Sequence, residues 1–452
     1  MTEPTTWSDL AGKRVGLWGL GAEGRATLAV LGALEAEVVI VDDNPSAATA
    51  ASEPGLLRGR PVLASDAAGM AALRNCDLVV KAPGISRYRP EVTALITAGV
   101  PVLGGLGLWL ASVDRSRVVC VTGTKGKSTT AAVMAHLARG LGIRAVACGN
   151  LGLPPWSPDA PTDVDLWVVE ASSYQITDFE VASPIVAVTS LSPDHLPWHG
   201  DVETYYRDKL SLCSLPGERR CIASAASPEL VAHADLVGPD VRWVDEHTWP
   251  GDWAAPLGLR GAHNDVNAAI ARTCLVELGI GSADDDATIT AAAEGFAPLE
   301  ARLETVGFHG GVEFVDDGLS TNVLPTLAAV DTFSGRRLAL IVGGAERNVD
   351  LTPLAAALAH RSDATLVLTT YSTGPAIEQA LRHEIAALST DDTPSTTEVR
   401  ACRDLTEAVK LGAQWASPDG VVLLSPAAAS FDAFRNYQHR SAVFRQAIAD
   451  LG

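Results

Sequence analysis

A glycine loop between a predicted buried strand and a predicted helix constrains this chain more than any other stretch. The apolar run Val118–Val121 is typical of a short buried strand, and apolar residues recur at helical spacing after Thr130. Between them lies Gly123-Thr124-Lys125-Gly126-Lys127-Ser128-Thr129. Backbone N–H groups and the positive end of a helix dipole bind phosphate at such a turn. We therefore predict that Lys127 neutralises the outer phosphates of a nucleotide and that the Ser128 hydroxyl ligates Mg²⁺.

The loop departs from the general phosphate-loop pattern at one position. That pattern has a glycine five positions before the glycine of Gly-Lys-Ser, and Val121 stands there, with the next glycine at Gly123. A plain strand-to-helix turn with an exposed lysine is the alternative. The strand before the loop and the helix after it favour phosphate binding.

A second glycine turn lies near the N-terminus. Gly19, Gly21 and Gly24 fit Gly-x-Gly-x-x-Gly after a strand, and a helix is predicted from about Arg25. The next strand, Val38–Val41, ends at Asp42, where a ribose-binding βαβ unit has an acidic residue. The pattern predicts a nucleotide site without identifying the nucleotide, and a tight turn with no ligand is the alternative.

A third turn, Pro83-Gly84, follows the predicted strand Asp77–Val80. Doubly wound sheets bind ligands at the carboxyl ends of their strands, so this turn belongs to the same predicted site.

Composition excludes several classes of function. A net charge of -20 argues against non-specific binding to nucleic acid or to an anionic membrane, because both need basic surface. The seven cysteines are scattered without metal-ligand spacing and are expected to be reduced core residues. No stretch of membrane-spanning length lacks charge or Pro/Gly interruption. We expect a cytoplasmic monomer with no nucleic-acid or membrane partner.

Strands and helices alternate along the chain, which predicts an α/β protein of three domains with mostly parallel sheets. We place the boundaries between these domains in polar segments, which gives domains over 1–113, 114–299 and 300–452. The first and third are expected to be Rossmann-like and the central one a P-loop-type ATPase. Late in the central domain we expect a helix over Ala268–Leu278, an acidic loop over Gly279–Thr290 and a helix over Ala291–Phe296.

Polar residues follow two strands of the predicted central sheet. Glu170 ends the strand Leu166–Val169, where a nucleotide-bound Mg²⁺ finds a carboxylate, although Ser172 and Ser173 also predict a helix cap there. His195 follows a strand and can reach the same sheet edge. Spacing alone predicts Lys209 to be an exposed lysine of a helix.

Taken together, these motifs resemble the Mur ligases, ATP-dependent amide-bond ligases of peptidoglycan precursor synthesis, and hence of cell-wall biogenesis, cell shape and cell division. The resemblance rests on the glycine loop, Glu170-x-Ser172-Ser173, Asp194-His195 with Lys209, His263-Asn264-x2-Asn267, Arg302 and Ser425-Pro426-x3-Ser430. The N-terminal glycine turn and Ala82-Pro83-Gly84-Ile85 resemble the branch that adds glutamate to UDP-N-acetylmuramoyl-L-alanine, whose first domain binds the UDP group.

The resemblance implies roles that spacing cannot assign. Lys209 matches a lysine carbamylated by CO₂, which with His195 would hold a second Mg²⁺, while Ser128 and Glu170 would hold the first. Catalysis would rest on Lys127, His195 and Lys209. ATP would contact Gly123, Thr124, Lys125, Gly126, Lys127, Ser128, Thr129, Asn264, Asn267, Arg302 and Asp317. The two other substrates would contact Gly19, Gly21, Asp42, Gly84, Asn150, Ser172, Thr321, Arg347, Ser430 and Tyr437.

The predicted glutamate pocket departs from the family pattern at two positions. The branch specific for D-glutamate has lysines where this chain has Leu319 and Arg347. Arginine keeps the charge but presents a planar fork instead of a point charge. These changes favour the divergent subfamily that adds L-glutamate. The alternative is a D-glutamate ligase whose pocket has drifted, because an arginine still binds a carboxylate.

Three other functions remain as alternatives. A folate polyglutamate synthase would lack the N-terminal domain. A nucleotide-dependent oxidoreductase would explain the first glycine turn but not the second. A non-catalytic ATP-binding scaffold would be expected to lose Lys127, Glu170, His195 or Lys209, and all four are present.

Overall fold

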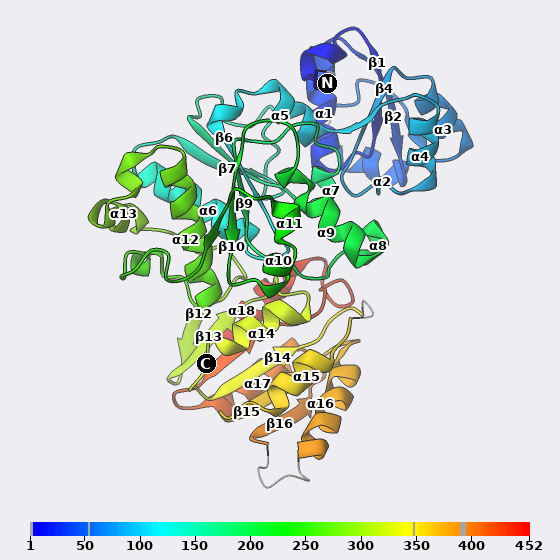
Figure 1. The fold of residues 1–452 in the computed structure, drawn as a ribbon. Coiled ribbons are helices and arrows are strands. Elements are labelled where there is room, and N and C mark those ends of the chain that lie inside the picture. Colours follow the sequence, from blue (N-terminus) through cyan, green and yellow to red (C-terminus); the bar gives the residue numbers. More distant parts are fainter. Residues whose placement is uncertain (1–2, 53–54, 347–348, 389–394) are drawn as a thin grey trace. The chain divides into compact units, whose positions relative to one another are not determined.

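The computed structural model describes residues 3–52, 55–346, 349–388 and 395–452. Its first sheet has five parallel strands in the order β3-β2-β1-β4-β5, of which Figure 1 labels β1, β2 and β4. The strands are β1 Arg14–Trp18, β2 Glu37–Asp42, β3 Val62–Ala64, β4 Leu78–Lys81 and β5 Val102–Gly104. The helices are α1 Ala22–Ala33, α2 Pro45–Ala50, α3 Ala67–Arg74, α4 Pro90–Thr97 and α5 Gly105–Ser112. The chain order reverses between β1 and β4, and ligands bind at such a point in doubly wound sheets.

The second sheet has six parallel strands in the order β11-β10-β9-β6-β8-β7. They are β6 Val118–Thr122, β7 Ala145–Gly149, β8 Leu166–Glu170, β9 Ile185–Val188, β10 Arg220–Ser224 and β11 Val241–Val244. Its helices are α6 Lys127–Gly140, α7 Ser173–Ile176, α8 Leu196–His199, α9 Val202–Leu210, α10 Pro228–Ala232, α11 Ala234–Val237, α12 Ala262–Glu277 and α13 Asp286–Ala293. Because β6 lies between β8 and β9, the glycine loop, Glu170 and the segment after β9 meet at one sheet edge.

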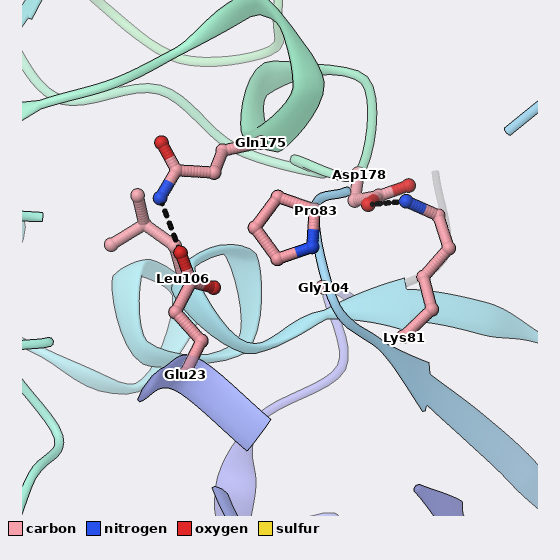
Figure 2. A pocket seen from close by; sticks show the side chains of 7 residues that line it. All are labelled: Glu23, Lys81, Pro83, Gly104, Leu106, Gln175 and Asp178. Carbon is pink, nitrogen blue, oxygen red and sulfur yellow. Dashed lines mark hydrogen bonds and ion pairs between the residues drawn. The ribbon is translucent and has the colours of Figure 1, made fainter. Parts of the chain in front are cut away.

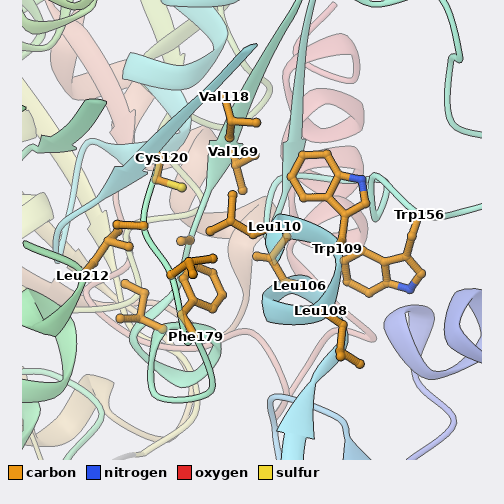
Figure 3. Packing of buried hydrophobic residues seen from close by; sticks show 14 of the residues in the cluster. Leu106, Leu108, Trp109, Leu110, Val118, Cys120, Trp156, Val169, Phe179 and Leu212 are labelled. Atoms are coloured by element: carbon orange, nitrogen blue, oxygen red, sulfur yellow. The ribbon is translucent and has the colours of Figure 1, made fainter. Parts of the chain in front are cut away.

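One hydrophobic core joins the first two sheets. Helix α5 follows the last strand of the first sheet and sends Leu106, Leu108 and Leu110 into the cluster that also contains Val118 and Val169 of the second sheet (Figure 3). Trp109 of the same helix packs edge-on against Trp167, with ring centroids 5.5 Å apart. Residues 1–257 and 264–296 accordingly form one compact unit.

The second compact unit consists of residues 258–263 and 297–452. Its six-stranded sheet has the order β12-β13-β17-β14-β15-β16, in which only β12 runs antiparallel to its neighbour. The strands are β12 Glu304–His309, β13 Val312–Asp316, β14 Leu338–Val342, β15 Thr365–Thr369, β16 Thr397–Ala401 and β17 Val421–Leu424. The helices are α14 Val323–Asp331, α15 Thr352–Ala359, α16 Gly374–Leu388, α17 Leu405–Ala416 and α18 Tyr437–Ala449.

The three sheets lie within 14–104, 118–244 and 304–424. The α/β class with mostly parallel sheets is therefore confirmed, while boundaries at 113/114 and 299/300 remain our proposal. None of the helices in the described part of the chain is long and apolar enough to cross a bilayer.

Two expectations late in the central region are wrong. The helix expected over Ala268–Leu278 begins six residues earlier, at Ala262, so Asn264 and Asn267 lie inside it. The acidic loop expected over Gly279–Thr290 contains the start of α13, which ends at Ala293. Asp285 explains the difference, because its side chain accepts a hydrogen bond from the Thr288 backbone N–H and caps that helix.

Candidate active site

The glycine loop joins β6 to α6 and needs glycine at two positions. Gly123 and Gly126 have φ values of 138° and 89°, in the region that favours glycine. A Cβ on Gly123 would lie 2.1 Å from Thr189 Oγ1, and a Cβ on Gly126 would lie 2.5 Å from Asn267 Oδ1. The backbone can therefore pack closely at the N-terminus of α6, where orphan N–H groups bind anions.

Two lysine side chains converge on this loop. Lys127 Nζ donates to the carbonyl oxygens of Gly123 at 2.9 Å and Thr124 at 3.0 Å. Lys209 Nζ, on α9, donates to the same Gly123 oxygen at 2.9 Å. The expectation of an exposed Lys209 is wrong: its residue is 1% exposed, because α9 turns this side chain toward the sheet edge. Burial, reinforced by the charge of Lys127, holds the pKa of Lys209 well below its usual range.

Glu170 ends β8 beside the loop. Its Oε1 accepts a hydrogen bond from Asn150 Nδ2 at 2.7 Å, whereas its buried Oε2 has no hydrogen-bond partner. An unpaired buried carboxylate oxygen is a suitable ligand for a hard cation. The described residues contain no group of three His, Cys, Asp and Glu side chains that could hold a metal. Ser128, the residue predicted to share a cation with Glu170, is buried at the start of α6.

His195 lies between β9 and α8 with a left-handed φ of 54°. Its backbone N–H donates to Asp194 Oδ1 at 2.9 Å, and Lys125 Nζ binds Asp194 Oδ2 at 3.2 Å. Burial, together with the charges of Lys209 and the loop lysines, lowers the pKa of His195 to about 4. The imidazole is therefore neutral at physiological pH and can act as a ligand or acceptor.

Two groups from other elements border the loop. Ser172 caps α7 in a capping box with Gln175, so the predicted cap is present beside Glu170. Asn264 and Asn267 lie in the first turns of α12, and Asn267 Nδ2 donates to Asn264 Oδ1 at 3.1 Å. The structure thus brings Asn267 to Gly126, which sequence spacing could not indicate.

The N-terminal glycine turn lies at the carboxyl end of β1. Gly19 has a φ of 98°, and a Cβ on Gly21 or Gly84 would meet no atom within 4 Å. Asp42 Oδ2 accepts a hydrogen bond from the Leu20 backbone N–H at 2.8 Å. Asp42 therefore braces the glycine turn in this structure.

A small crevice at the same sheet edge was not predicted. It is lined by Glu23, Lys81, Pro83, Gly104, Leu106, Gln175 and Asp178 (Figure 2). Lys81 Nζ and Asp178 Oδ2 form a buried ion pair at 2.5 Å, and Gln175 Nε2 donates to Glu23 Oε1 at 2.6 Å. Burial raises the pKa of Glu23 to about 7. A lysine at the end of an apolar strand was the one sequence signal.

In the second compact unit, Asp317 is the centre of a buried polar cluster. Its Oδ2 accepts hydrogen bonds from Ser425 Oγ at 2.7 Å and Ser320 Oγ at 2.5 Å. Burial raises the pKa of Asp317 to about 7, partly offset by these hydroxyls and by the charge of Arg302. The cluster joins the turn after β13 to the segment after β17.

The other predicted pocket residues of this unit lie on the same two segments or just beyond them. Thr321 is half-buried, Ser430 is buried, and the half-buried Tyr437 begins α18. Leu319 is half-buried and donates its backbone N–H to the Ala301 oxygen. Arg347 lies outside the described residues.

Lysine is rare in this chain and concentrated at the site. The six lysines are Lys13, Lys81, Lys125, Lys127, Lys209 and Lys410. Lys13 and Lys410 are exposed, whereas the other four make the contacts described above.

Two domain families match the chain. Residues 121–237 match the Mur ligase middle domain, and residues 301–428 match the Mur ligase glutamate ligase domain. Among solved structures, UDP-N-acetylmuramate-alanine ligase from Thermotoga maritima shares the fold, with a TM-score of 0.56, 18% identity and coverage of 97% of this chain and 100% of that chain. Folylpolyglutamate synthase from Mycobacterium tuberculosis, complexed with ADP, has a TM-score of 0.53 and 16% identity, with coverage of 73% of this chain and 91% of that chain.

Curated relatives are much more similar in sequence. UDP-N-acetylmuramoyl-L-alanine–L-glutamate ligase from Salinispora tropica is 37% identical over 460 residues, covering 98% of this chain and 99% of the relative. The protein of the same name from Xanthomonas axonopodis pv. citri is 37% identical over 466 residues, covering 97% of this chain and 96% of the relative. Identity of this level over nearly the whole length confirms the resemblance seen in the motifs: the chain belongs to the Mur ligase family.

Proposed function

We propose that this chain joins L-glutamate to UDP-N-acetylmuramoyl-L-alanine, forming an amide bond in peptidoglycan precursor synthesis and converting ATP to ADP and phosphate. As a Mur ligase it is an ATP-dependent, amide-bond-forming enzyme. The observation that carries the proposal is the convergence of Lys127 and Lys209 on the Gly123 carbonyl beside Glu170 and His195. A phosphate loop with a second, buried lysine suits transfer of a phosphoryl group to a carboxylate.

The chemistry has two steps. The terminal carboxylate of the L-alanine residue attacks the γ-phosphate of ATP, and the bond to the β-phosphate oxygen breaks, giving an acyl phosphate and ADP. The neutral amine of glutamate then attacks the acyl carbon, and inorganic phosphate leaves. Lys127 and the N–H groups at the start of α6 offset the charge on the phosphoryl oxygens in the first step.

Ser128 and Glu170 would hold one Mg²⁺, and His195 with carbamylated Lys209 would hold a second. Bound Mg²⁺ supplies charge neutralisation on the phosphates. The unpartnered Oε2 of Glu170 fits the first of these roles. His195 fits the second role because its low pKa keeps a ring nitrogen unprotonated.

A carbamate forms when a neutral amine attacks CO₂ and loses a proton, which converts a cation into an anionic oxygen ligand. Burial and the neighbouring Lys127 favour the neutral amine of Lys209. This is the physical support for placing the carbamate there.

We assign UDP-substrate binding to residues 1–113, ATP binding to 114–299 and glutamate and ATP binding to 300–452. The reversal of strand order between β1 and β4 supports the first assignment, because doubly wound sheets bind ligands at such a point. Asn150, Ser172 and Gly84 would contact the uridine-linked substrate. Tyr437, Thr321, Ser430 and Arg347 would contact glutamate. We propose that the enzyme works as a monomer in the cytoplasm.

The enantiomer is proposed on two grounds. Leu319 replaces the family lysine that accompanies D-glutamate, and the relatives above carry L-glutamate in their names. A D-glutamate ligase is the second candidate, since Arg347 retains a positive charge in the sequence.

One assay tests the proposal. Purified chain receives ATP, Mg²⁺ and UDP-N-acetylmuramoyl-L-alanine, with L- and D-glutamate offered separately, and phosphate release and amide product are measured. Turnover should require the nucleotide substrate and L-glutamate. Turnover with D-glutamate alone would overturn the choice of enantiomer, and no amide product with either would overturn the ligase assignment.

A further inference from the structure

The segment from Lys81 to Tyr88, which we name the clasp, follows β4 of the first sheet. It contacts the end of α7, and it also contacts α8 and α9, which all belong to the central sheet. Its first anchor is the ion pair between Lys81 and Asp178, whose side chains are 0% and 1% exposed (Figure 2). Arg87 Nη1 adds hydrogen bonds to the Thr177 oxygen at 2.8 Å and to Asp178 Oδ1 at 3.1 Å. Both oxygens of the buried carboxylate are thereby paired, which fixes the clasp against the end of α7.

The second anchor of the clasp is Trp198 on α8. Trp198 Nε1 donates to the Pro83 oxygen at 3.2 Å, and Ser86 Oγ donates to the Trp198 oxygen at 2.8 Å. The Trp198 ring stacks on Tyr174 at 4.6 Å, and Tyr174 packs edge-on against His195 at 5.0 Å. Trp198 and Tyr174 thus form a chain of packed rings between the clasp and His195.

The third anchor reaches α9 one residue before Lys209. Tyr88 OH donates to Asp208 Oδ1 and Oδ2 at 2.8 and 2.9 Å. The buried His199 ring places Nδ1 2.6 Å from Asp208 Oδ2 and Nε2 2.9 Å from Ser173 Oγ. The Asp208 carboxylate on α9 is therefore bound by Tyr88 of the clasp and by His199 of α8, and Ser173 of α7 contacts the other nitrogen of the His199 ring.

These anchors lie on both sides of Gly84 in the sequence, and Gly84 is the proposed contact of the nucleotide substrate. We propose that the clasp couples substrate binding at Gly84 to the placement of Lys209, with Tyr88, His199 and Asp208 as positioning residues. The proposal rests on the function proposed above for Lys209 and Gly84. Misplacement of a catalytic group by about 1 Å costs about 100-fold in rate, so even a small shift of α9 is measurable.

Tyr88→Phe tests the proposal most cleanly. It removes both hydrogen bonds to Asp208 and keeps the ring, which packs edge-on against Trp198 at 6.0 Å. Tyr206→Phe is the matched control, because it removes a 3.4 Å hydrogen bond to Glu229 from the same helix. Asp208→Asn keeps an acceptor for Tyr88 and should show a smaller loss than Tyr88→Phe.

Two measurements are needed: hydrogen–deuterium exchange of residues 202–210 with and without UDP-N-acetylmuramoyl-L-alanine, and steady-state kinetics. Tyr88→Phe should speed exchange in the free protein by about tenfold and lower kcat by about tenfold or more, because it removes charge-assisted hydrogen bonds. Its KM for ATP should stay within about twofold of the wild-type value. The nucleotide substrate should slow exchange in α9 of the wild type and of Tyr206→Phe, but much less in Tyr88→Phe.

The outcomes separate this proposal from the proposed function. The proposed coupling would be overturned if Tyr88→Phe and Tyr206→Phe had equal exchange rates in α9 and equal kcat. It would also be overturned if the nucleotide substrate slowed exchange in α9 equally in the two variants. A second outcome is that the wild type forms no amide product, but the nucleotide substrate slows exchange in α9 of the wild type and not of Tyr88→Phe. In that case the ligase assignment would fail and the proposed coupling would stand.

Discussion

Lys209 illustrates what a single residue's sequence context can and cannot tell. Its helix was predictable from spacing, but its burial was not, because burial depends on the glycine loop and on the Tyr205 ring, which lies 5.0 Å from Nζ. Glu170 is the opposite case. A polar residue at the end of an apolar strand lies at the sheet edge whatever else the fold does, so its place followed from the sequence.

Replacing Lys209 by alanine should lower kcat by at least about 100-fold, because it removes a buried polar group at the proposed site of phosphoryl transfer. Lys410→Ala, on an exposed position of α17, is the control and should leave the rate unchanged. Initial rates of ADP formation would be compared at saturating substrates. A Lys209→Ala enzyme with full activity in CO₂-depleted buffer would rule out the carbamate.

Glu23 should make stability depend on pH. Its pKa is raised from 4.5 to about 7 in the folded protein, so the folded state binds more protons than the unfolded state between these values. The contribution of Glu23 to the free energy of unfolding is therefore greatest below about pH 4.5, and it falls as the pH rises toward 7. Glu23→Gln removes the charge, so it should be more stable than the wild type by about 1–3 kcal/mol at pH 8 and nearly equal to it at pH 4.

Urea unfolding at both pH values checks this prediction, with Glu294→Gln on an exposed side chain as the control. A Glu23→Gln difference that was the same at pH 4 and pH 8 would contradict it.

At the scale of elements, continuous apolar runs predicted strands, whereas some strands with exposed charged residues gave no such signal. β14 and β17 consist of buried apolar residues, and the apolar runs Leu338–Val342 and Val421–Leu424 in the sequence alone predict strands with these bounds. β11 and β16 carry charged residues and show no regular burial pattern, so their strand state is set by pairing with β10 and β15. The early start of α12 was missed for a related reason: polar residues near its N-terminus gave no helical pattern, although Asn264 and Asn267 are buried and Asn267 lies against Gly126 of the glycine loop.

The glycine loop gives a prediction for an element as a whole. Gly126→Ala forces a Cβ to within 2.5 Å of Asn267 and should lower kcat/KM for ATP by at least about 100-fold. Gly142→Ala is the matched control, since Gly142 has a similar φ of 83° at the far end of α6 but open space around it. Both variants should lose about 1 kcal/mol of stability from backbone strain, and only Gly126→Ala should lose ATP-dependent turnover.

ATP kinetics and thermal unfolding together make this comparison. Equal losses of kcat/KM in the two variants would show that strain in α6, and not the fit of the loop against Asn267, limits activity.

At the scale of the molecule, the sequence indicated three α/β regions but not how two of them share a core. The polar segment near residue 113 suggested separate packing on either side. Helix α5 lies before that segment and nevertheless packs its leucines with strands that lie after it. Such sharing depends on which faces of distant elements meet, and no local pattern records that.

Thiol chemistry should report the integrity of the whole fold. All seven cysteines are free and buried, and burial raises the pKa of Cys120 to about 11. An aromatic disulfide reagent at pH 8 should therefore titrate fewer than about one thiol per native chain. In guanidinium chloride it should titrate all seven thiols. Rapid reaction of several thiols without denaturant would mean that the cores described here open readily.

Because lysine is scarce in this enzyme, reagents that acylate amines can modify it at only a few positions. Of its six lysines, Lys81 and Lys209 are buried, Lys125 and Lys127 are partly exposed, and Lys13 and Lys410 are exposed. A dye or a solid support that reacts with amines should therefore attach most readily at Lys13 and Lys410, which lie outside the proposed nucleotide site. Acylation of the partly exposed Lys125 or Lys127 would then be detected by a loss of turnover that nucleotide prevents.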